Sequence, residues 1–136
     1  EFQAFGWDPK AIPDPQDPET FHRSKLNWGE LEEPSHKDML DWYRKLIGIR
    51  RKTPDLLDGR TDCVITRFDE AAQWFQMNRS AIRTICNFAK VRQRIPLETG
   101  MIWKILAASD ETISTSMDGV HLPPESAVIL RREEGL

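Results

Sequence analysis

The sequence has few of the residues on which metal, redox or phosphate chemistry depends. It contains only two cysteines, Cys63 and Cys86, and neither stands near another cysteine or a histidine at metal-ligand spacing. No glycine-rich phosphate loop, His-Glu-x-x-His motif or calcium-loop spacing occurs. We therefore expect no metal site and no cofactor.

The sequence also lacks a long apolar run and an excess of one charge. No segment has the length and composition of a signal peptide or a membrane span. The 19 basic and 22 acidic residues give a net charge of −3, with both signs interspersed. No basic patch of the kind that follows a phosphate backbone is visible. We predict a soluble protein with neither a membrane nor a nucleic acid as partner.

The length sets a further limit. A chain of 136 residues can form one modest domain, whereas a catalytic (β/α)₈ barrel usually needs about 250. The sequence starts at Glu1 without an initiator methionine, so we expect a piece of a larger protein. Both cysteines lie in apolar stretches and are predicted to be buried free thiols, the usual state in the cytosol. A cytoplasmic location follows as an expectation.

Proline and aromatic residues are concentrated near the start of the chain. Five of the nine prolines occur in the first 34 residues, and each fixes φ and removes a backbone donor. We therefore expect neither a regular helix nor a central strand there. The same stretch has too much aromatic surface for a solvated linker. It is predicted to be an ordered loop that docks onto another part of the protein. The aromatic residues are Phe2, Phe5, Trp7, Phe21 and Trp28.

One long amphipathic helix is predicted over residues 35–52. Ser35 and Asp38 resemble a capping box, and Thr53-Pro54 would end the helix. A short helical turn over residues 54–59 would follow. Apolar residues recur at helical spacing, and the other face is charged. The apolar residues are Met39, Leu40, Tyr43, Leu46 and Ile47.

From Asp62 onward, short β-rich runs alternate with turn residues. This pattern is typical of an antiparallel sandwich or barrel. The turns are expected at residues 69–70, 78–80 and 118–119. The predicted fold class is thus mainly β: an antiparallel β-sandwich preceded by the long helix and the proline-rich loop. Candidate strands are residues 63–68, 72–77, 82–87, 92–97, 101–106 and 126–131, with a short one at 120–122.

No complete active site can be assembled from the residues alone. A serine or cysteine nucleophile needs a base and an orienting group, but the three histidines are isolated in the sequence. Aromatic rings can stack on sugars, and Phe5, Trp7 and Trp28 are candidates for this role. The same rings could instead fill an interface with a missing domain, which is the simpler interpretation. Trp74 and Trp103 lie on predicted strands and are expected to pack in the core.

Several motifs nevertheless resemble one enzyme family along nearly the whole chain. The segment 1–8 (EFQAFGWD) is followed by PDPQDP at 13–18 and by LDWYR at 40–44. Near the end, LPPESA occupies residues 122–127, preceded by LAASD at 106–110. Together these residues resemble the maltooligosyltrehalose trehalohydrolase family of the α-amylase superfamily. The resemblance is strongest up to Pro54.

The resemblance implies an architecture for the parent protein. Members of this superfamily combine a (β/α)₈ barrel with a C-terminal antiparallel β domain. Residues 1–60 would then be the end of the barrel, with its final helix, and residues 61–136 the C-terminal β domain. Because loops after barrel strands build the active face, Phe5, Trp7 and Asp8 would border the substrate cleft as substrate-binding residues.

The resemblance also implies a reaction. The parent would release trehalose from a maltooligosyl trehalose by cleaving an α-1,4-glucosidic bond, a reaction that needs a pair of carboxyl groups. The family carries its catalytic carboxylates on upstream barrel strands, so no residue of this chain is assigned a catalytic role. The expected partners are the missing barrel and, through the parent enzyme, maltooligosyl trehalose or a related α-glucan.

Two other interpretations remain open. The β region could be an autonomous carbohydrate-binding module, for which Trp74 and Trp103 would be the candidate residues. Alternatively, the loop and helix could form the docking surface of a protein-interaction domain.

Overall fold

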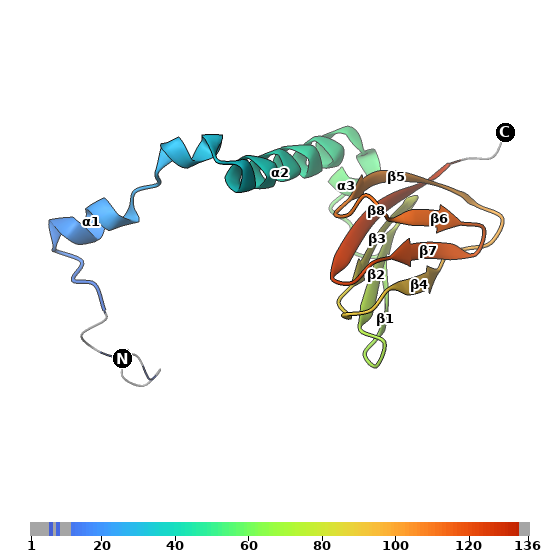
Figure 1. The fold of residues 1–136 in the computed structure, drawn as a ribbon. Helices are drawn as coiled ribbons and strands as arrows, with labels where there is room; N and C mark the ends of the chain where they lie inside the picture. The colour runs from blue at the N-terminus through green and yellow to red at the C-terminus, as the bar shows by residue number, and fades with distance from the viewer. Residues whose placement is uncertain (1–5, 7, 9–11, 134–136) are drawn as a thin grey trace. The chain divides into compact units, whose positions relative to one another are not determined.

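A computed structural model describes residues 6, 8 and 12–133. The chain divides into two compact units, residues 1–40 and 41–136, which are treated separately below. Eight strands lie in antiparallel sheets within the described residues, together with a few helices (Figure 1). The predicted fold class, mainly β with an antiparallel sandwich, is confirmed.

The first unit contains short helices where a loop was expected. Helix α1 spans Pro18–Ser24, and the 3₁₀ helix η3 spans Trp28–Glu32. The expectation that proline excludes a regular helix there was wrong, because Pro18 begins α1, where no backbone donor is needed. The Asp17 side chain caps this helix by accepting a hydrogen bond from the Glu19 amide at 2.9 Å. The prolines therefore set where the helices start.

The long helix is confirmed almost as predicted. Helix α2 spans Pro34–Lys52, and the short α3 spans Pro54–Leu57. Pro34 begins α2, so Ser35 lies inside the first turn and not at the N-cap that the predicted capping box requires. That part of the prediction was wrong. Three basic residues, 50–52, occupy the last turn, where their positive charges interact favourably with the negative end of the helix dipole. No helix in the described part of the chain is long and apolar enough to cross a membrane.

The strands of the second unit form two sheets. The five-stranded sheet has the order β1-β2-β3-β8-β5, and the three-stranded sheet has the order β4-β7-β6. In Figure 1 the smaller sheet lies across the larger one. The larger sheet consists of β1 (Val64–Asp69), β2 (Trp74–Arg79), β3 (Ile82–Asn87), β8 (Ser126–Glu133) and β5 (Ile102–Ala108). The smaller consists of β4 (Gln93–Pro96), β7 (Gly119–Leu122) and β6 (Ser114–Ser116).

Seven of these strands agree with the predicted ranges to within about two residues. The missed strand is β6, whose Ser114–Ser116 residues are all polar and exposed, so that no apolar alternation marks it. The predicted hairpin turn at 78–80 is shifted, because Asn78 and Arg79 still belong to β2. The turn falls at Ser80 and Ala81, and Ser80 adopts a φ of 49°.

Gly119 lies at a close approach between two strands. It opens β7 and pairs with Pro96 of β4. A Cβ atom at this position would lie 2.7 Å from the backbone oxygen of Ile95. Glycine is therefore needed for steric reasons, and the residue belongs to a strand instead of only to the predicted turn.

The apolar core lies between the two sheets. Alternate residues of β3 and β8 point into it, since Ile85 pairs with Val128 in the register of these strands. Trp103 is 7% exposed and belongs to this core, while Trp74 is half-buried and packs against it. Both tryptophans thus pack as predicted. The remaining buried members of the cluster are Ile95, Leu97, Ile113, Val120, Leu122 and Leu130.

A single polar side chain joins several segments at the edge of this core. Asn87, at the end of β3, is 1% exposed. Its amide nitrogen donates to the carbonyls of Val91 and Pro123 at 2.9 and 2.8 Å. Its oxygen accepts from the Ala89 amide at 3.0 Å and from the Gln93 side chain at 2.9 Å. Asn87 therefore satisfies backbone groups before β4 and between β7 and β8, where loops would otherwise bury unpaired polar atoms.

We predict that Asn87→Ala lowers the free energy of unfolding by about 2–3 kcal/mol, because it leaves several buried groups without a partner. Urea denaturation of the 136-residue chain measures the change. Ser114→Ala, at an exposed position of β6, is the control and should alter stability by less than about 0.5 kcal/mol. Equal effects of the two substitutions would contradict the role given to Asn87.

Candidate functional site

Of the three residues predicted to bind substrate, the structure describes only Asp8. Phe5 and Trp7 lie outside the described residues, and Asp8 is exposed. Trp28, the other aromatic candidate near the start of the chain, is 72% exposed on η3. Its ring is accessible for stacking or for an interface. The assignment of Phe5, Trp7 and Asp8 to a substrate cleft stays a prediction.

The carboxyl groups with perturbed pKa values are unlike general acids. A hydrogen bond from Arg60 lowers the pKa of Asp62. Asp110 accepts hydrogen bonds from the Thr112 side chain and backbone, and these lower its pKa too. The Ser116 hydroxyl has the same effect on Asp118. A general acid needs a pKa raised toward neutrality, so these ionised groups do not fit that role.

Neither metal-site geometry nor a disulfide is found among residues 6, 8 and 12–133. No group of three or more His, Cys, Asp or Glu side chains there could hold a metal ion. Cys63 and Cys86 are free and partly buried, so the predicted free thiols are confirmed while their complete burial is not. Burial raises the pKa of the Cys86 thiol, which keeps it protonated and poorly nucleophilic.

Arg83 is a buried charged residue of the β domain that several contacts hold in place. Arg83 is 6% exposed, and its guanidinium lies 5.1 Å from the ring centroid of Trp103. It donates to a carboxylate oxygen of Glu98 at 2.8 Å and to the Ser80 carbonyl at 2.8 Å. This arrangement neutralises a buried cation and holds the Glu98 segment against β3.

The environment of Glu98 acts on its pKa in two directions. Burial raises the pKa, but hydrogen bonds and the positive charges of Arg83 and Arg67 outweigh burial, so the pKa is lowered overall. Sequence reasoning missed this pair because Arg83 occupies one position of an otherwise ordinary strand. Only the alternation of β3, with Ile85 and Asn87 buried, could have indicated that Arg83 also points inward.

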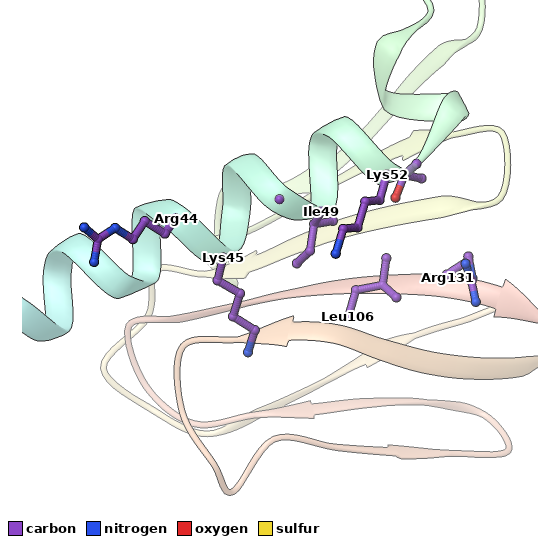
Figure 2. A pocket seen from close by; sticks show the side chains of 8 residues that line it. Arg44, Lys45, Ile49, Lys52, Leu106 and Arg131 are labelled. Carbon is purple, nitrogen blue, oxygen red and sulfur yellow. The ribbon is translucent and has the colours of Figure 1, made fainter.

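A second charged feature is a cleft between the last turns of α2 and the outer side of the large sheet. Its volume is about 460 Å³. Arg44, Lys45, Ile49 and Lys52 line it from the helix, and Leu106 and Arg131 line it from β5 and β8 (Figure 2). The described residues that line the cleft include four cationic side chains and no acidic one. Its charge therefore differs from the slightly acidic balance of the whole chain.

Comparison with known families identifies the β domain. Residues 59–129 match the family described as a domain of unknown function, DUF3459. The chain belongs to the DUF3459 family. The matched residues contain β1 to β7 and the first four residues of β8. Lys45 and Lys52, by contrast, precede the DUF3459 match.

Curated relatives extend the similarity over nearly the whole chain. It is 43% identical over 134 residues to the malto-oligosyltrehalose trehalohydrolase of Rhizobium sp. strain M-11, covering 96% of this chain and 22% of the relative. The enzyme of the same name from Brevibacterium helvolum is 37% identical, with the same coverage of both chains. The recognised resemblance is thereby confirmed. This DUF3459 chain spans about a fifth of the length of these relatives.

Solved structures support the fold. A Salmonella typhimurium protein assigned as an alpha amylase matches with a TM-score of 0.69 and 23% identity, over 96% of this chain and 21% of its own. Trehalulose synthase MutB from Pseudomonas mesoacidophila matches with a TM-score of 0.52 and 24% identity, over 68% of this chain and 17% of its own. At these identities the likeness shows that the DUF3459 chain shares their fold.

We predict that Glu98→Gln destabilises the protein at neutral pH and has less effect in acid. Because the folded-state pKa of Glu98 is lowered, its contribution is complete above the unfolded-state pKa, about 4.3, and is lost as the pH falls through the folded-state value. The loss at pH 7 should be modest, since the Glu98 side chain is 38% exposed and solvent screens the pair.

Urea denaturation of both proteins from pH 7 to about pH 3 tests this prediction. Glu70→Gln, in the exposed turn between β1 and β2, is the matched control and should show little difference at any pH. A difference between wild type and Glu98→Gln that does not change with pH would contradict the proposed linkage.

Proposed function

We propose that this chain is the C-terminal part of a glycoside hydrolase that releases trehalose from maltooligosyl trehalose by cleaving an α-1,4-glucosidic bond. In this proposal the chain is non-catalytic and supports the enzyme's barrel. The observation that carries the proposal is the 43% identity, over 134 residues, to an enzyme named malto-oligosyltrehalose trehalohydrolase. The parent would act on maltooligosyl trehalose or a related α-glucan in the cytoplasm.

The lowered carboxyl pKa values support a non-catalytic role. Glycoside hydrolysis uses one carboxyl group as an acid with a raised pKa and a second as nucleophile or base. Local hydrogen bonds instead lower the pKa of the Asp62, Asp110 and Asp118 carboxyls, so none of these three groups fits the role of the acid. Because this chain spans 22% of the Rhizobium relative, the catalytic residues are proposed to lie in the remainder of the protein.

Exposed apolar side chains support docking onto a barrel. On α2, Tyr43 and Ile47 stand four residues apart and are 58% and 49% exposed, whereas Leu46 and Ile49 are half-buried. The first unit shows the same property in Phe21, Leu26 and Trp28. Several large apolar groups exposed together are characteristic of a surface that another part of the protein covers. Residues 1–60 would supply the end of the barrel, and residues 61–136 would brace it.

The carbohydrate-module alternative has less support. It was motivated by Trp74 and Trp103, but Trp103 is buried in the core and Trp74 is half-buried against it. A sugar-stacking site needs an accessible ring. On the described part of the β domain, exposed aromatic side chains are Phe68 and Phe88, each 62% exposed and on different segments. The supporting role therefore fits the burial pattern better.

A chimera tests the proposed function. If this chain replaces the matching 134 residues of the Rhizobium enzyme, we expect trehalose release from maltotriosyl trehalose at a rate within about tenfold of that enzyme. The 136-residue chain alone should release none. The Rhizobium enzyme lacking the segment is the control and should be unstable or inactive. Trehalose release by the isolated chain, or an inactive but folded chimera, would overturn the proposal.

The docking surface gives a separate prediction. Tyr43→Ser with Ile47→Ser should change the stability of the isolated chain by no more than about 1 kcal/mol, because both side chains are exposed there. In the chimera the same two substitutions should lower the free energy of unfolding by more, about 3 kcal/mol. The reason is that burying each side chain contributes about 1.5–3 kcal/mol. Urea denaturation of both proteins measures the difference. Arg51→Ser, also on the exposed surface of α2, is the control.

A further inference from the structure

The cationic cleft beside α2 brings together charges that are far apart in the sequence. Lys45 and Lys52 are seven residues apart and lie on one side of the helix, because seven residues make about two turns. Arg131 comes from β8, and Figure 2 shows Lys45 and Lys52 extending from the helix toward the strands that carry Leu106 and Arg131. Folding thus brings these three cations to one cleft, which Arg44 of the helix also lines.

The sheet register adds a fifth positive charge beside the four that line the cleft. Lys104 of β5 lies directly opposite Arg131 of β8. Side chains opposite each other on neighbouring strands are about 4.5–5.5 Å apart at Cβ, and like charges there are destabilising. The strands therefore place two cations together at an energetic cost. An anion between them would remove that cost.

The protein neutralises the cations of this region only in part. At the far end of the cleft, Arg44 forms an ion pair with Asp41 at 3.1 Å. The Lys45 ammonium lies 5.8 Å from the centroid of the Trp42 ring. In the described part of the chain, Lys52, Lys104 and Arg131 have no carboxylate within 4 Å. Glu133, which follows Arg131 by two residues on β8, likewise forms no ion pair in that part.

The surface between the cations is partly apolar, with Thr53 as a polar residue, and leaves room for a ligand body. Ile49 and Leu106, both half-buried, line the cleft. Gly48 also lines it, and a Cβ atom placed at this residue would meet no atom within 4 Å. The volume of about 460 Å³ falls within the range of small-molecule sites, about 300–1,000 Å³. The cleft thus combines charged groups with an uncharged surface.

We propose that this cleft binds an organic phosphate of about hexose size. The phosphate lies between Lys52 and Arg131, because a doubly charged group matches paired ammonium and guanidinium donors better than a single carboxylate does. The uncharged part of the ligand lies on Ile49, Leu106 and the open space at Gly48. The site is separate from the substrate cleft of the proposed function, and it does not depend on that function.

Isothermal titration of the 136-residue chain with glucose 6-phosphate at low salt tests the proposal. We expect saturable binding that weakens as salt is added, since these charges are exposed to solvent. Lys52→Gln and Arg131→Gln should each weaken binding about tenfold or more, because each removes a charged hydrogen-bond donor. Arg50→Gln makes the same charge change on an exposed residue of α2 that does not line the cleft, and should change affinity by less than about twofold.

Inorganic phosphate and glucose separate the two parts of the ligand. Glucose 6-phosphate should bind more tightly than inorganic phosphate, and glucose should not bind measurably. Gly48→Leu fills the apolar part of the cleft. The variant should stay folded, because a Cβ atom at this position meets no neighbour and leucine favours a helix more than glycine does. We expect this substitution to weaken the binding of glucose 6-phosphate about tenfold. The affinity for inorganic phosphate should change by less than about twofold.

Three results would overturn the proposal. The first is no saturable binding of either phosphate at concentrations up to tens of millimolar. The second is an equal loss of affinity in Arg50→Gln and Lys52→Gln, which would mean diffuse attraction to the helix. The third is equal affinity for the two phosphates in both the wild type and Gly48→Leu, which would exclude a role for the apolar surface. Thermal unfolding of each variant checks that it is folded.

Discussion

The apolar layer between the two sheets is the constraint on which the rest of the β domain depends. A five-stranded and a three-stranded sheet can each bury only one face, and here the shared face is filled by Ile85, Val128 and their neighbours. The loops that cross between the sheets must bring polar backbone into this layer. Asn87 meets that requirement by bonding loop carbonyls and an amide, so one side chain fixes how the two sheets are joined.

The two faces of the larger sheet differ in whether their positively charged side chains have an acidic partner. On the core side, Arg83 is buried, stacks near Trp103 and is neutralised by Glu98. Outside the core, Arg131 lies opposite Lys104 and shares a cleft with Lys52, without a carboxylate partner among the described residues. A buried cation must be paired to be tolerated, whereas a surface cation has solvent as an alternative. The unpaired surface cations are therefore the ones available to a ligand.

The exposed apolar groups of the helices complement this description of the β domain. Helix α2 has no fully buried residue, although its sequence carries enough apolar side chains for two contact faces. Leu46 and Ile49 are half-buried, while Tyr43 and Ile47 remain exposed. In a chain that spans about a fifth of its relatives, this distribution fits a helix that serves two neighbours, with the β domain as one of them.

Local pattern was enough to predict the elements that carry a clear period. Helix α2 followed from apolar spacing, and seven strands followed from alternation between turn residues. Strand β6 was not predictable, because Ser114–Ser116 is entirely polar and is held as a strand by pairing with β7. Helix α1 was missed because Pro18 was taken as a breaker when it is the first residue of the helix.

The sequence by itself determined the fold class, the long helix and the family, since these depend on periodicity and motifs along the chain. It also indicated that no catalytic set is complete here. Only the tertiary structure decided which charges meet. Arg83 finds Glu98 fifteen residues away, and Lys52 shares a cleft with Arg131 almost eighty residues away. Such pairs depend on sheet order and on where a helix rests, and both are set by long-range packing that no local pattern encodes.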